Sequence, residues 1–66
     1  MKYYGIIYFS PNPIWFTNGY PYPFEPSRQD KPYLFTDEAS ANEMMVALAN
    51  RYGVNVESFK VKEYEV

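Results

Sequence analysis

Residues 3–24 read YYGIIYFSPNPIWFTNGYPYPF, and this stretch contains no Asp, Glu, Lys or Arg. It holds nine of the fourteen aromatic residues and four of the six prolines of the 66-residue chain. Every charged side chain other than Lys2 follows Phe24. The stretch therefore supplies either most of a hydrophobic core or an apolar surface for a partner.

The composition limits how so short a chain is stabilised. We expect one domain over residues 1–66, which buries only about 60% of the surface that its unfolded form exposes. The chain has no Cys and no His, so disulfides are excluded and the commonest metal ligands and the commonest general base are missing. Aromatic residues make up 21% of it and can supply a dense core. We expect no metal and no cofactor.

The charge and the apolar runs point to a cytoplasmic protein. The formal net charge is -2, which argues against nucleic acid or an anionic membrane as a partner. No apolar run approaches the roughly 20 residues of a membrane span, and no secretory signal pattern is visible. The absence of Cys fits a reducing compartment.

Two parts of the aromatic stretch predict strands. Residues 2–9 are apolar on both alternating faces, which is typical of an interior strand, and Gly5 indicates a close approach by another ring or backbone. Asn18-Gly19 between aromatic runs predicts a two-residue hairpin turn within residues 14–24. In that register Trp15 pairs with Tyr22, and the prolines lose only an N–H that points away from the partner.

The prolines leave an alternative open for the second half of this hairpin. Residues 20–26 could form a loop of polyproline-II geometry, although we favour the hairpin. Residues 23–28 also match P-x-x-P-x-R, a pattern read by SH3-type grooves. That match is short and common by chance, so a plain loop is the preferred interpretation.

The second half of the chain predicts one helix and a last strand. Residues 33–35 suggest a short strand, and Thr36 is the expected N-cap of a helix over about residues 37–52, which Gly53 ends. Its apolar stripe consists of Ala41, Met45, Leu48 and Tyr52. Residues 54–66 return to strand with a bulge or bend near Glu57-Ser58, and their charges are typical of a protected edge.

These elements predict an α+β fold of two layers. Three or four strands precede the helix and one follows it, and the helix packs across a mostly antiparallel sheet of three to five strands. Cross-strand pairing in the hairpin places the candidate partner-binding side chains together, with the last one alongside: Trp15, Tyr20, Tyr22 and Phe24. One helix covers one face only, so these rings either complete the core or form an exposed patch for a partner or a second copy.

Single-stranded nucleic acid is the alternative ligand. Lys2, Lys60 and Lys62 could gather beside aromatic rings on the sheet, if the first and last strands are neighbours. Nearby acids dilute that charge: Glu57, Glu63 and Glu65. A Trp–Tyr platform for sugar rings lacks recognisable polar companions.

Catalysis has the least support. No serine stands beside an evident activating base, and the three glycines form no phosphate-binding loop. We therefore predict no enzyme, but a small protein-binding module that acts as an inhibitor, regulator or adaptor through the aromatic hairpin. Such a module could be carried by a phage or mobile element. The alternatives are binding of single-stranded nucleic acid, which is disfavoured as a partner, and a homodimer with a structural role.

Overall fold

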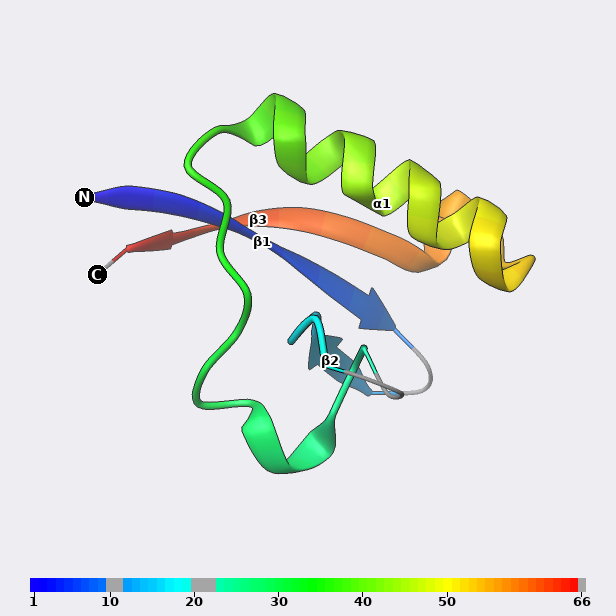
Figure 1. Cartoon of the computed structure of the whole chain (residues 1–66), viewed down its shortest axis with the longest axis horizontal. Helices are drawn as coiled ribbons and strands as arrows, with labels where there is room; N and C mark the ends of the chain where they lie inside the picture. Colours follow the sequence, from blue (N-terminus) through cyan, green and yellow to red (C-terminus); the bar gives the residue numbers. More distant parts are fainter. Residues whose placement is uncertain (10–11, 20–22, 66) are drawn as a thin grey trace.

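The computed structural model describes residues 1–9, 12–19 and 23–65. In this part of the chain one α-helix, α1 (Glu38–Tyr52), packs on a three-stranded antiparallel sheet (Figure 1). The sheet has the order β2-β1-β3, with bounds Pro13–Trp15, Lys2–Phe9 and Phe59–Glu65. Two 3-10 turns, η1 (Pro26–Arg28) and η2 (Val56–Ser58), complete it. The predicted small α+β fold is confirmed.

Strand β1 is the interior strand, as its two-sided apolar pattern predicts. It pairs antiparallel with β2 along one edge and with β3 along the other. Gly5, Ile6 and Ile7 are buried in succession, so both faces of the strand are covered at its centre. Because side chains alternate along a strand, Ile6 faces α1 and its two neighbours face the opposite side of the sheet.

The edge of β1 that carries β2 is shared by two separate segments. The Phe16 N–H donates to the Ile6 carbonyl at 2.7 Å, and the chain then leaves the sheet. Further along, Tyr4 and Phe35 exchange two backbone hydrogen bonds of 2.9 and 2.8 Å. The Tyr33 N–H donates to the Phe16 carbonyl at 2.8 Å and joins the two segments. The predicted strand at 33–35 is thus one isolated bridge at Phe35.

The predicted hairpin around Asn18-Gly19 is wrong. Asn18 has a positive φ of 54°, but the only glycine with positive φ among the described residues is Gly53. The N–H and the hydroxyl of Thr17 both donate to the Pro23 carbonyl, at 2.8 and 3.1 Å, so the turn is wider than two residues. Residues 20–22 lie outside the described part of the chain.

Strand β2, which precedes this turn, pairs with β1 instead of forming the predicted hairpin. Trp15 pairs with Ile7 and Ile14 with Tyr8, so β2 pairs antiparallel with β1, the strand before it in the chain. That pairing extends a ladder on a central strand that is buried on both faces. The local turn preference of Asn-Gly, which would have paired Trp15 with Tyr22, did not prevail over it.

Helix α1 begins one residue later than its expected cap implies. The N-cap is Asp37 and not Thr36, because an Asp37 carboxylate oxygen accepts from the Ser40 N–H at 2.7 Å. The helix ends as predicted at Gly53, which has a left-handed φ of 64°. The buried stripe contains Ala41, Leu48 and Ala49, whereas Tyr52 is 47% exposed and lies outside it.

The core lies between α1 and the sheet. Its fully buried large side chains are Ile6 and Phe16, at 0% and 1% exposure. Phe24 packs on the same side, with its ring centroid 5.4 Å from that of Phe16 and 5.9 Å from that of Phe59. The bend predicted near residues 57–58 is the 3-10 turn η2, after which β3 begins at Phe59.

Truncating Phe16 should unfold most of the protein. A Phe→Ala change in a core costs about 3–5 kcal/mol, while a domain of this size has about 3–10 kcal/mol in total. We expect Phe16→Ala to lose most of its far-UV circular dichroism signal, or to unfold at much lower urea. Val46→Ala, at a side chain that is 47% exposed on α1, is the control and should leave the urea midpoint nearly unchanged.

The loss of stability on removing the helix cap should depend on pH. The hydroxyl and the N–H of Ser40 hold the pKa of Asp37 below its ordinary value of 3.8. The folded-state pKa is lowered, so the stabilisation is complete above 3.8 and disappears as the pH falls through the folded-state value. Asp37→Ala should therefore melt below the wild type at neutral pH, and the difference should shrink in strong acid. An equal loss in Thr36→Ala would contradict the assignment of the cap.

Candidate functional site

The face of the sheet that α1 leaves uncovered is the candidate site, and we call it the open face. Strand alternation and contacts to Gly5 place ten described residues on it: Tyr3, Gly5, Ile7, Phe9, Pro13, Trp15, Leu34, Lys60, Lys62 and Tyr64. All three strands contribute to it, and most of its side chains are aromatic or aliphatic. The open face is therefore an apolar surface with two lysines.

Trp15 lies at the centre of the open face because Gly5 leaves room for its ring. A Cβ atom on Gly5 would come within 2.5 Å of Trp15 Cζ3 and 2.8 Å of Cε3, so no larger residue fits beneath the ring. The Tyr64 ring meets the indole at 89°, with centroids 5.5 Å apart. This is the close approach by a ring that Gly5 predicts.

The backbone of Trp15 is held from outside the sheet by one side chain. The Trp15 N–H donates to Gln29 Oε1 at 2.6 Å, and Gln29 Nε2 donates to the Trp15 carbonyl at 3.1 Å. The same Nε2 donates to the Glu25 carbonyl at 3.0 Å. The amide thus takes the place of a neighbouring strand beside β2. Sequence reasoning missed Gln29, since a polar residue in a polar loop carries no periodic signal.

A depression of about 360 Å³ lies beside Trp15 on the open face. It is lined by Ile7, Phe9, Pro13, Trp15, Lys60 and Lys62. Phe9 is 45% exposed at its rim, whereas Ile7 is only 6% exposed. The depression therefore has an apolar interior and two cationic groups along one side.

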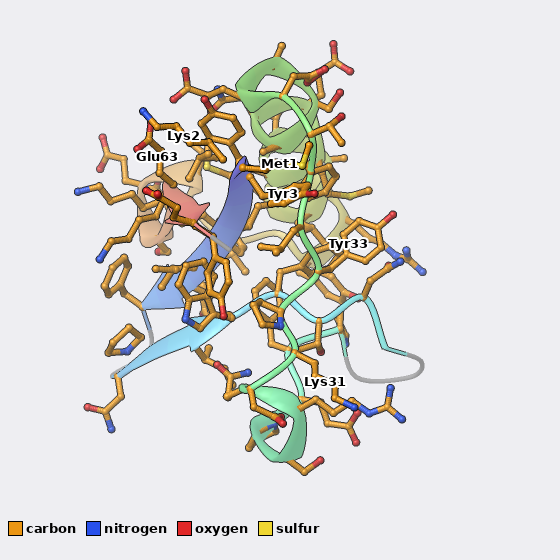
Figure 2. All side chains as sticks on the ribbon, turned by 90° about the vertical axis from the view of Figure 1, so that its left-hand side faces the viewer. Met1, Lys2, Tyr3, Lys31, Tyr33 and Glu63 are labelled. Atoms are coloured by element: carbon orange, nitrogen blue, oxygen red, sulfur yellow. The ribbon has the colours of Figure 1, made fainter. Side chains whose placement is uncertain are left out.

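The charges of β3 are separated between the two faces. Glu63 pairs with Tyr4 in the β1–β3 register and so points to the α1 side, as does Glu65. There the Glu63 carboxylate lies 3.9 Å from the Lys2 ammonium, and Figure 2 shows the two side chains together. Glu63 thus offsets the charge of Lys2, as predicted, while Lys60 and Lys62 lie on the other face, where Lys2 does not join them.

Two of the predicted partner-binding residues, Trp15 and Phe24, lie on opposite faces of the sheet. Trp15 is on the open face, whereas the Phe24 ring contacts Tyr8, Phe16 and Phe59 on the α1 side. Tyr20 and Tyr22 lie outside the described residues.

The P-x-x-P-x-R segment lacks the geometry that SH3-type grooves read. Pro26–Arg28 is a 3-10 turn, and Arg28 Nε lies 3.4 Å from Glu25 Oε2.

Neither a search for metal-binding clusters and membrane-spanning helices nor comparison with known proteins adds a further site. Across residues 1–9, 12–19 and 23–65, no three His, Cys, Asp or Glu side chains cluster so that they could hold a metal ion. No helix in those ranges has the length and apolar character to cross a bilayer. The chain matches no family model, and no curated protein or solved structure proved similar to it.

Replacing Gln29 should loosen Trp15. Gln29→Leu keeps much of the side-chain volume but leaves the partly buried N–H and carbonyl of Trp15 without partners, which costs about 1–3 kcal/mol. We expect a lower urea midpoint and a change in the emission of Trp15, the only tryptophan. Ser27→Ala, at an exposed position of η1, is the control. Unchanged stability in Gln29→Leu would show that the amide does not hold β2.

Proposed function

We propose that the protein is a non-catalytic binding module that captures another protein through the open face and acts as an inhibitor, regulator or adaptor. One observation carries the proposal: the only tryptophan sits on the sheet face that α1 leaves uncovered, beside a depression of about 360 Å³. Trp and Tyr are enriched among the residues that dominate the energetics of protein interfaces.

The way Trp15 is held supports this role. Its backbone bonds to Gln29, and its ring is confined by Gly5 and by Tyr64. A side chain that is already ordered loses little conformational entropy when a partner binds. Phe9 adds an apolar ring that is 45% exposed on the same face. Together they offer a partner a rigid apolar contact area.

The chemistry of the open face supports binding over catalysis. Its described residues offer only amines and phenols as reactive groups, without a carboxylate, an aliphatic hydroxyl or an imidazole to form a nucleophile–base pair. We propose the cytoplasm as the setting, since the chain has no Cys and disulfides belong to oxidising compartments.

Single-stranded nucleic acid is the second candidate ligand. It is favoured by the two lysines beside aromatic rings on a face whose described residues include no acid. Two lysines would neutralise few phosphates, however, and the formal net charge of -2 repels a polyanion. Protein binding is therefore the first proposal.

Capture from native cell extract, followed by mass spectrometry, tests the proposal. Trp15→Ala should abolish capture, and Phe9→Ala on the same face should weaken it, because both remove apolar contact area. Val46→Ala, at a residue exposed on α1, should capture as the wild type does. Circular dichroism checks the fold of each variant. Should Trp15→Ala prove unfolded, the capture result for Phe9→Ala decides the test.

Two results would contradict the proposal. One is capture that is unchanged in folded variants of both open-face residues. The other is capture that disappears after nuclease treatment, together with oligonucleotide binding that falls steeply with salt. The second result would establish the nucleic-acid alternative.

A further inference from the structure

We propose that the partner docks through an acidic and apolar segment, with an apolar side chain in the depression and carboxylates against Lys60 and Lys62. This inference rests on the proposed function and names the chemistry of the partner. It draws on the position of the two lysines, on their lack of partners, and on the contrast with the other face of β3.

The two lysines border the depression along β3. Lys60 stands opposite Ile7 and Lys62 opposite Gly5 in the β1–β3 register. The Trp15 ring covers Gly5, and Ile7 is buried, so the lysine stems stand beside an apolar surface. Lysine buries its methylene stem along apolar surface and keeps its ammonium in water. The two ammonium groups therefore lie at the rim of the depression.

Neither of these lysines has an anionic partner within the described residues. The ion pairs there are Lys2 with Glu63, at 3.9 Å, and Arg28 with Glu25, at 3.4 Å. Both lie away from the open face, and the nearest acids along the strand point to the α1 side. A carboxylate that arrives at the open face thus meets two cations and no like charge among the described residues, which favours an acidic partner.

The spacing of the lysines suits an extended segment. Residues two apart on one strand are separated by roughly 6.6 Å, because the rise is about 3.3 Å per residue. Carboxylates at alternate positions of an extended peptide repeat at the same distance. Such a segment can match Lys60 and Lys62 one to one, while a neighbouring apolar residue enters the depression.

The charges of the open face also favour an acidic peptide over a second copy of the chain or a nucleic acid. A second copy that docks face to face brings its own Lys60 and Lys62 against the same pair, so like charges meet. A nucleic acid gains only two cationic contacts from this face, against a net charge of -2. A peptide with two carboxylates gains the same contacts with far less opposing charge.

Trp15 emission is the readout for a direct test, since this tryptophan lines the depression. The probe is a synthetic peptide with Glu at alternate positions next to a Phe, and the control is the same peptide with Gln in place of Glu. We expect the wild-type chain to bind the Glu peptide up to about tenfold more tightly, because two exposed ion pairs each contribute modestly. The double variant Lys60→Gln and Lys62→Gln should bind both peptides alike.

Charge reversal completes the test. Lys60→Glu with Lys62→Glu should prefer a peptide with Lys at the alternate positions. Lys31→Glu is the matched control, since Lys31 is an exposed lysine between η1 and α1 (Figure 2) and should leave the preference unchanged. In extract, the reversed double variant should lose the proteins that the Lys31→Glu variant keeps.

The outcomes separate this inference from the proposed function. Equal binding of the Glu and Gln peptides, or binding of neither, overturns the acidic partner. Retention of captured proteins by the reversed double variant also overturns it, while loss of capture in Trp15→Ala would still support protein binding. Tighter binding of a thymidine oligonucleotide, lost in both Trp15→Ala and the double variant, overturns both proposals.

Discussion

The rest of the structure depends on the hydrogen-bond ladder of β1. One edge of this strand holds β3 over the length of both strands, while the other edge is divided between β2 and Phe35. The chain leaves the sheet after Phe16, and a loop brings it back beside β1 at Phe35. The returning loop carries Gln29 to the outer side of β2, where it fixes the backbone of Trp15. One ladder thus orders both the core and the open face.

The elements predicted correctly are those whose local signals agree with the tertiary structure. The apolar pattern of β1 and the end of α1 at Gly53 are of this kind. The Asn18-Gly19 hairpin failed because β2 pairs with β1, a central strand that is buried on both faces. Thr36 was the predicted N-cap, but Asp37 holds that position in the structure. Both residue types are good caps, so only the backbone geometry decides between them.

The sequence indicated part of the open face. An excess of aromatic rings over what one helix can cover predicted an exposed patch, and Trp15 lies on the open face, where it is partly buried. Phe24 went to the core because the wider turn carries it to the α1 side. Strand alternation places the lysines and the glutamates of β3 on opposite faces. The prediction for this segment used only its total charge and therefore missed the separation. Gln29 could not be foreseen, since its role depends on a contact fourteen residues away in sequence.

The alternating charges of β3 have a consequence for self-association at high protein concentration. Among the described residues no strand pairs with the outer edge of β3. Antiparallel pairing of two copies along this edge places residues of the same phase opposite each other. A two-fold axis at residue 60, 61 or 62 then sets lysine against lysine, and one at 63 or 64 sets glutamate against glutamate. Like charges directly opposite destabilise such a ladder. An exposed strand edge in an aromatic-rich chain would ordinarily promote aggregation. Here the like charges of β3 disfavour edge-to-edge pairing with a second copy.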